Sequence, residues 1–351
     1  MAGLYAGRLA GLGMDVELLD EVFPATPTVV GRLRGSRPGR TVVLNGHLDT
    51  VPIPHDPPRI DGDTIFGRGS ADMKGALACA AETARVLAGR GSFPGELVIV
   101  AIGLHEAPGG RGEDLTHFLH ETGFTADLAV VCELAGHTFV VAHMGTVTVE
   151  IEVSRPGIPT HELQTPAGTP HPLMAAGRVI SAIEARTREL AATEHPWVGA
   201  ETYFLGELHG GDFYNRHPTT CRLVGTRRWA PGTTLAEVDA ELRALLAPIA
   251  EETGCTIEAE LRLVRDSYRI DPESGPARAL RGAYHDVTGN ELPLTGMKVV
   301  ADGAIFHGAG IPTLYHGPVG SGAHADVESI EIPELVRATE VYLALLERLS
   351  A

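Results

Sequence analysis

Apolar runs alternate with amphipathic stretches along the first part of the chain. Three runs are short, largely apolar and rich in β-branched residues, which is typical of buried strands; they are residues 41–44 (TVVL), 96–102 (ELVIVAI) and 127–132 (DLAVVC). Helices are predicted over residues 2–13 and 73–90, and a further strand over 14–19. Strands that alternate with helices indicate an α/β fold with a mostly parallel sheet.

The pattern changes near Gly145. Residues 146–153 (TVTVEIEV) alternate between polar and apolar positions, as expected for an antiparallel strand with one solvated face. The segments that follow are predicted to be helix, strand, helix and strand, at residues 172–188, 222–229, 235–252 and 256–264. This order predicts a small α+β unit.

The α/β pattern returns after Tyr268. The segments that carry it are a helix, an apolar run and a closing helix, at residues 276–288, 311–318 and 332–349. We therefore expect one domain formed by residues 1–145 and 269–351, with a second domain, residues 146–268, inserted into it. A chain of 351 residues is comfortable for two domains.

Composition narrows the partners and the compartment. The formal net charge of −17 argues against a nucleic-acid partner, because the chain lacks the excess of basic groups that neutralises phosphates. No apolar run approaches the roughly 20 residues of a membrane span, and the N-terminus lacks the pattern of a signal peptide. The four cysteines are scattered without pairing or metal-ligand spacing, so we expect reduced thiols. These features predict a cytoplasmic protein with neither a nucleic-acid nor a membrane partner.

Polar residues that follow the predicted strands are the candidate chemistry. His47 and Asp49, in NGHLDTVP, come directly after the strand 41–44, and side chains two residues apart point to the same side of an extended backbone. They can supply a metal ligand and a carboxylate that fixes the imidazole tautomer. Asp72, in GRGSADMKG, opens the helix 73–90, where its carboxylate could bridge two cations.

These two segments resemble the motifs of the dinuclear-zinc amidohydrolases, a family that includes acetylornithine deacetylase, succinyl-diaminopimelate desuccinylase, glutamate carboxypeptidase and aminoacylase. The resemblance covers nearly the whole chain. It implies a zinc-peptidase-like α/β catalytic domain with an inserted α+β lid or dimerisation domain. It also implies two divalent metal ions, most simply zinc with cobalt or manganese as alternatives. The family normally has one more helix before residue 2, which suggests a truncated start or a true start further upstream.

The resemblance also assigns metal ligands. Two neighbouring cations need about five protein ligands, one of them a bridging carboxylate. By resemblance Asp72 is the bridge; His47 and Glu133 complete one site, and Glu106 and His324 complete the other. His324 lies in GSGAHADVESI, which looks like the Gly-rich AHxxxE turn of the family. The peptide bond after Asp72 is expected to be cis, as is usual in the family.

One segment departs from the family pattern. After the strand predicted at residues 96–102, the family has Glu-Glu, a general base followed by a metal ligand. This chain has His105, Glu106 and Ala107 there. Counting forward from Gly95 makes His105 the base and Glu106 the ligand. Counting backward from the following glycine pair makes Glu106 the base and leaves Ala107 at the ligand position. We favour the forward count, because strand registers slip less readily than loops change length. His105 would then be the proton shuttle, with Glu113 as a fallback base.

The remaining candidates lie in the inserted domain and beyond it. The lid segment of the family resembles residues 155–168, RPGIPTHELQTPAG. This resemblance aligns His161 with a histidine that stabilises the oxyanion in the partner subunit's site, and it therefore implies a homodimer. Asn215 fits the asparagine of the NxxP motif, and Arg228 fits an arginine that would hold a substrate carboxylate. Asp302 matches the SDxR segment, but Ala304 replaces its arginine, so no substrate preference can be carried over.

The sequence thus predicts a metal-dependent hydrolase. Its substrate would be an amide bond in an N-acyl amino acid or short peptide with a free carboxylate, attacked by a metal-bridged hydroxide. The alternative is a catalytically impaired homologue with a metal-binding or regulatory role, in which loss of the glutamate base ended hydrolysis. A serine hydrolase is disfavoured, because the chain has no GxSxG motif.

Overall fold

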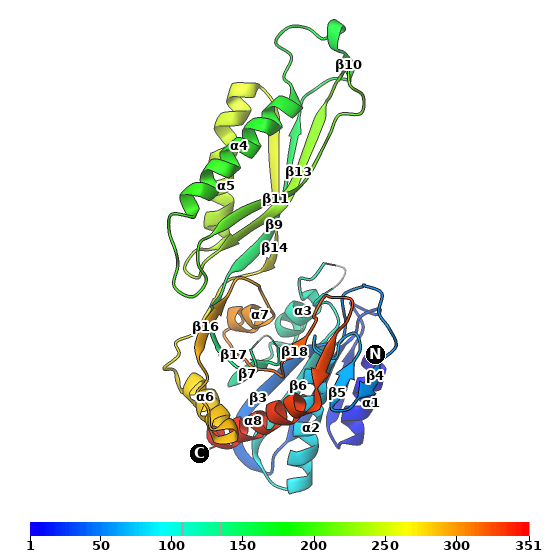
Figure 1. Ribbon diagram of the computed structural model, residues 1–351, viewed down its shortest axis with the longest axis vertical. Coiled ribbons are helices and arrows are strands. Elements are labelled where there is room, and N and C mark those ends of the chain that lie inside the picture. The colour runs from blue at the N-terminus through cyan, green and yellow to red at the C-terminus, as the bar shows by residue number, and fades with distance from the viewer. Residues whose placement is uncertain (107–108, 134, 351) are drawn as a thin grey trace. The chain divides into compact units, whose positions relative to one another are not determined.

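The computed structural model describes residues 1–106, 109–133 and 135–350. The chain forms two compact units (Figure 1). Unit 1 consists of Met1–Val141, Arg269–Gly296 and Ala301–Ala351. Unit 2 consists of Ala142–Tyr268 and Met297–Val300.

Unit 1 is built on a six-stranded sheet with the strand order β1-β2-β6-β3-β7-β17. Its strands are β1 (Asp15–Leu19), β2 (Thr28–Arg34), β3 (Arg37–His47), β6 (Pro94–Ile102), β7 (Leu128–Val131) and β17 (Thr313–Tyr315). Strands β6, β3, β7 and β17 are parallel, whereas β1 and β2 pair antiparallel. The last six residues of β3 and of β6 are buried, which explains their nearly continuous apolar sequence.

The helices of unit 1 surround this sheet. They are α1 (Ala2–Gly11), α2 (Lys74–Arg90), α3 (Glu113–Thr122), α6 (Gly275–Thr288), α7 (Gly303–Gly308) and α8 (Ile332–Ser350). Helix α2 packs on β3, β6 and α8. Gly46 permits this close packing, because a Cβ atom there would lie 2.7 Å from Met73 Cε and 2.9 Å from Leu77 Cδ2. The loop before α2 is thereby held beside the end of β3.

Two smaller sheets are also present. One has the order β18-β19-β5-β4, formed by β4 (Arg59–Asp61), β5 (Thr64–Phe66), β18 (Gly320–Ser321) and β19 (Ser329–Glu331). The other has the order β15-β8-β16, formed by β8 (Phe139–His143), β15 (Tyr268–Arg269) and β16 (Leu294–Met297). The turn between β18 and β19 carries His324, whose φ of 62° is unusual for a residue with a side chain.

Unit 2 is a four-stranded antiparallel sheet with the order β11-β13-β9-β14. Its main elements are β9 (Gly145–Ser154), α4 (Pro172–Leu190), β11 (Thr202–Gly210), β13 (Thr220–Trp229), α5 (Leu235–Thr253) and β14 (Thr256–Arg265). Both helices lie on one face of the sheet (Figure 1), where Val179 and Leu242 join the inward residues of β9 in the core. The other face explains the alternating pattern of β9. The remaining short elements are β10 (Thr160–His161), β12 (Arg216–His217) and a 3₁₀ turn at Glu162–Gln164.

The α/β fold with a mostly parallel sheet, predicted from the apolar pattern, is confirmed. Every helix predicted from the sequence is present, with ends that differ by a few residues. Strands β2 and β11 were not predicted; β11 is an edge strand whose residues are mostly exposed, so it lacks an apolar run. Residues Met297–Val300 pack in unit 2, although the sequence-based boundary grouped them with residues 269–351. Within the described ranges, no helix is both long enough and apolar enough to cross a bilayer.

Candidate metal centre

Three neighbouring parallel strands end at the same edge of the unit 1 sheet. His47 is the last residue of β3, while Glu106 and Glu133 follow the ends of β6 and β7. Because β3 lies between β6 and β7, the ends of these strands bring the three side chains to one place. Side chains at the carboxyl ends of parallel strands are the usual site residues of open α/β sheets.

Asp72 lies at the centre of the candidate centre, with one histidine facing each carboxylate oxygen. Its Oδ1 is 3.0 Å from His47 Nε2, and its Oδ2 is 3.3 Å from His324 Nε2. Each histidine has a second acidic neighbour: His47 Nε2 lies 3.9 Å from Glu133 Oε2, and His324 Nε2 lies 2.8 Å from Glu106 Oε1. Two sets of possible ligands therefore share one carboxylate. The peptide bond between Asp72 and Met73 is cis, as expected.

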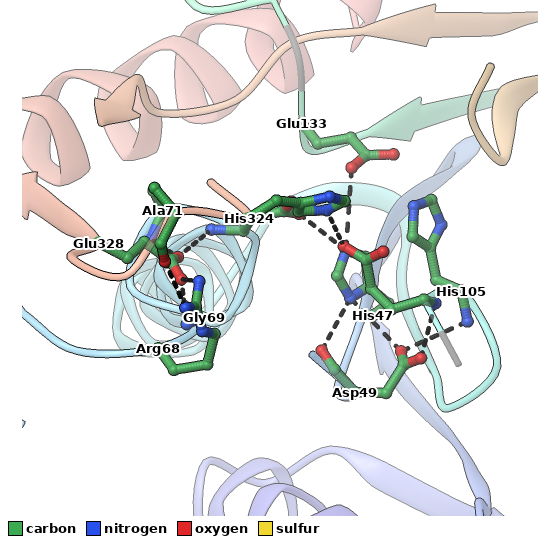
Figure 2. A network of polar contacts seen from close by, with 12 residues as sticks. His47, Asp49, Arg68, Gly69, Ala71, His105, Glu133, His324 and Glu328 are labelled. Atoms are coloured by element: carbon green, nitrogen blue, oxygen red, sulfur yellow. Dashed lines mark hydrogen bonds and ion pairs between the residues drawn. The ribbon is translucent and has the colours of Figure 1, made fainter. Parts of the chain in front are cut away.

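Asp49 orients the residues around it. The ring of His47 has Nδ1 3.0 Å from the carbonyl oxygen of Asp49 and 3.4 Å from its Oδ1 (Figure 2). Nδ1–H therefore donates to Asp49, and Nε2 faces Asp72. The Asp49 carboxylate also accepts hydrogen bonds from the backbone nitrogens of His105, at 3.4 Å, and Glu106, at 2.7 Å. Asp49 thus fixes both the tautomer of His47 and the backbone at His105 and Glu106, where the sequence departs from the family pattern.

The charges of this cluster favour a cation. Burial lowers the pKa of His47, but hydrogen bonds to Asp49 and Asp72 raise it by more, so the pKa lies well above its usual value. Burial raises the pKa of Asp72, but the hydrogen bond and charge of His47, with the charges of His105 and His324, together outweigh it and lower the pKa to about 2. Glu133 is buried, which raises its pKa, and among the described residues its Oε1 has no hydrogen-bond partner. A buried, unpartnered carboxylate oxygen beside imidazoles fits a divalent metal ion.

His105 lies flat against His47, with ring centroids 4.2 Å apart and planes inclined by 3°. Its Nδ1 is 2.8 Å from Oδ2 of Asp302, a buried residue just before α7. Burial lowers the pKa of His105, but the carboxylates of Asp302 and Glu133 together raise it by more. Asp302 was given no role from the sequence; its position in ADGAIF was the only available signal.

The structure allows the forward and backward counts of the segment at His105 and Glu106 to be compared at one ligand position. Glu106 contacts His324, the neighbour that the forward count gives it. Ala107, the ligand position of the backward count, lies outside the described residues. Glu113 begins α3 and pairs with Arg111 at 3.0 Å. It belongs to none of the possible ligand groups in the described part of the chain.

The candidates of unit 2 form two local arrangements. His161 is exposed; its Nδ1 accepts from the backbone nitrogen of Leu163, and its Nε2 is 3.1 Å from Asn215 Nδ2. Arg228 donates from Nη1 to Thr146 Oγ1 at 2.9 Å and to the carbonyl oxygen of Lys298 at 2.8 Å.

A parallel α/β sheet with imidazoles and carboxylates gathered at its strand ends can bind divalent cations. Residues 43–348 match the sequence profile of Peptidase family M20/M25/M40, and the chain belongs to this family of hydrolytic enzymes.

Relatives in this family include deacylases and peptidases. The chain is 29% identical over 380 aligned positions to N-formyl-4-amino-5-aminomethyl-2-methylpyrimidine deformylase of Halalkalibacterium halodurans, covering 95% of this chain and 85% of the relative. It is 28% identical over 369 positions to succinyl-diaminopimelate desuccinylase of Paracoccus denitrificans, covering 98% and 92%. The fold is shared with aminopeptidase PepT of Bacillus cereus, with a TM-score of 0.81 at 19% identity, covering 99% of this chain and 92% of that chain.

Proposed function

We propose that the chain is a metal-dependent hydrolase that cleaves an amide bond in an N-acyl amino acid or short peptide with a free carboxylate. The observation that carries this proposal is the position of Asp72, each of whose oxygens faces a different histidine with its own acidic neighbour. Such a shared carboxylate suits two neighbouring cations, the arrangement that hydrolytic two-metal sites use.

The two cations, most simply zinc with cobalt or manganese as alternatives, would share Asp72. His47 and Glu133 would hold one, and Glu106 and His324 the other. When bound, the cations would polarise the scissile carbonyl and lower the pKa of a bound water.

His105 is the proton acceptor in this proposal. Its Nδ1–H donates a hydrogen bond to Asp302, so Nε2 is the ring nitrogen that can accept a proton. Asp302 would hold the ring in this tautomer, as the aspartate of a catalytic triad does for the histidine base. Glu113, paired with Arg111, is the fallback base.

Unit 2 would supply substrate recognition. We propose that residues 146–268 act as a lid and dimerisation domain for a catalytic domain of residues 1–145 and 269–351. In a homodimer, His161, supported by Asn215, would stabilise the oxyanion in the site of the second copy. Arg228 would bind the substrate carboxylate. All four cysteines are free and buried, which agrees with a reducing compartment, and we propose the cytoplasm.

The relatives suggest which acyl groups to test. One relative is named for removal of a formyl group and another for removal of a succinyl group. We therefore propose a panel of N-formyl, N-acetyl and N-succinyl amino acids, the N-formyl aminomethylpyrimidine and dipeptides. Each is assayed with added zinc, cobalt or manganese, and Asp72→Asn serves as the matched inactive control.

The expected result is metal-dependent turnover of at least one carboxylate-bearing compound, abolished by a chelator and absent in Asp72→Asn. The second candidate, an impaired metal-binding homologue, is favoured by the presence of His105 where the family pattern has a glutamate base. Two bound cations without turnover of any compound would decide for that candidate. Failure to bind a cation would reject both.

A further inference from the structure

A buried ion pair joins the loop that carries Asp72 to the turn that carries His324. Arg68 Nη1 donates to Glu328 Oε2 at 3.0 Å, and the two side chains are 2% and 1% exposed. Arg68 also donates from Nη2 to the carbonyl oxygen of Ala325, the residue next to His324. Figure 2 shows Arg68 and Glu328 beside Gly69 and Ala71, although the pair is separated by 260 positions in the sequence.

The carboxylate of Glu328 is saturated with hydrogen bonds from this loop. Its Oε1 accepts from the backbone nitrogens of Ala71 and Asp72, both at 2.8 Å, and its Oε2 accepts from the backbone nitrogen of Gly69 at 2.9 Å. Together with Arg68, four donors therefore hold one carboxylate. Such charge-assisted bonds are the strongest and most directional of protein hydrogen bonds. The backbone that presents Asp72 is thus fixed by a residue from the turn of His324.

The two candidate histidines differ in how they are held. His47 is 0% exposed at the end of the central strand β3 and bonds to Asp49 through Nδ1. The His324 side chain is 56% exposed and sits at a positive φ in a turn. The placement of His324 against Asp72 therefore depends on the position of its turn, which Glu328 and Arg68 tie to the Asp72 loop.

We propose that Glu328 and Arg68 are positioning residues for the cation site formed by Asp72, Glu106 and His324. They hold Asp72 Oδ2 and His324 Nε2 close together before a cation binds, so the site needs little reordering on binding. This inference rests on the proposed metal centre. Its main effect falls on this site, because His47 and Glu133 of the other site are placed by β3 and β7, and only the shared Asp72 extends a smaller effect to that site.

The test compares Glu328→Gln with the unchanged protein and with Glu331→Gln. Gln has the shape of Glu, but its amide nitrogen cannot accept a hydrogen bond and would face two of the four donors. Glu331 is exposed and ends β19, the short strand that begins directly after Glu328, so its variant is a matched control. Metal-free protein is titrated with cobalt(II), using calorimetry for stoichiometry and affinity and visible absorption for the environment of each cation.

Two equivalents of cobalt are expected for the unchanged protein and for Glu331→Gln. In Glu328→Gln, one equivalent should bind about 10- to 100-fold more weakly, the usual loss on removing an outer partner of a metal ligand, while the other, which shares only Asp72, should weaken less. Addition of Glu328→Gln to His324→Ala should weaken the remaining cation by no more than this smaller loss, because the larger effect acts on the site that His324→Ala removes. A general loss of stability would weaken both cations alike.

Three results would overturn the inference. They are wild-type affinity for both equivalents in Glu328→Gln, equal weakening of both, or, in the His324→Ala background, a loss larger than the one that Glu328→Gln alone causes at the less affected cation. If Glu328→Gln does not fold, Arg68→Gln takes its place; it leaves the backbone bonds to Glu328 and should weaken the same equivalent. An unchanged protein that binds no cobalt would instead reject the proposed metal-dependent function, and this inference with it.

Discussion

The Nδ1 atom of His105 lies 2.8 Å from Oδ2 of Asp302, which joins two residues 197 positions apart. His105 stands where the resemblance expects a glutamate base. A buried carboxylate behind an imidazole fixes its tautomer and stabilises its protonated form, which is how histidine bases are oriented in unrelated hydrolases. Asp302 thus makes His105 suitable for proton transfer, although the family pattern has a glutamate at this position.

Asp302→Asn should lower kcat by at least about 10-fold with little change in KM, because the neutral amide no longer fixes or stabilises the His105 ring. Steady-state kinetics on the best compound of the panel measure this, and cation content should be unchanged. In the His105→Ala background, Asp302→Asn should have no further effect on kcat. An additional loss in that background would mean that Asp302 does not act through His105.

Glu106→Ala and His105→Ala should have different effects on metal content. Glu106 contacts His324 at 2.8 Å, so its removal should cost one cation as well as activity. His105→Ala should retain both cations and lower turnover by roughly 10²- to 10⁴-fold, the usual contribution of a general base. Elemental analysis beside kinetics measures both quantities. Full occupancy in Glu106→Ala, with a cation lost in His105→Ala, would reverse the assignment.

The apolar pattern was sufficient to predict β3, β6 and β7, and the resemblance then assigned His47, Glu106 and Glu133, which follow or end these strands, as metal ligands. The pattern could not predict Asp302 or Glu328 as partners. Glu328 accepts hydrogen bonds from backbone nitrogens within residues 69–72. Nearly every residue has a backbone N–H, so the sequence does not show which of them a side chain contacts. The contact between Asp302 and His105 depends on how α7 packs, which periodicity does not encode.

Removal of metal should destabilise unit 1. Without a cation, the positive charge that faces Asp72 and the buried Glu133 comes from the neighbouring imidazoles. At a free zinc concentration about 100 times Kd, binding should stabilise the native state by roughly 2.7 kcal/mol per site. Thermal unfolding with zinc and with a chelator measures this. Asp72→Asn should show a much smaller difference, and equal shifts in both proteins would place zinc elsewhere.

His316 should make the protein acid-sensitive independently of the metal centre. It is fully buried in unit 1, and its Nε2 accepts from Arg337 Nη1 at 3.5 Å. Burial, with Arg337 adding to it, lowers the pKa of His316 to about 3. In the unfolded chain a histidine has a pKa of roughly 6.5. Below that pH the unfolded state takes up a proton that the native state refuses, so stability is complete above about 6.5 and falls as the pH drops toward 3.

The loss is about 1.4 kcal/mol per pH unit, or about 2 kcal/mol between pH 6.5 and 5. His316→Gln can still accept from Arg337 but does not titrate, so it should lose about 2 kcal/mol less than the unchanged protein over that interval. Urea unfolding of both proteins in chelator, at pH 7.5 and 5.0, separates this effect from loss of metal. Equal losses in the two proteins would show that His316 is protonated in the native state, because a group that titrates alike in both states makes no contribution to the pH dependence of folding.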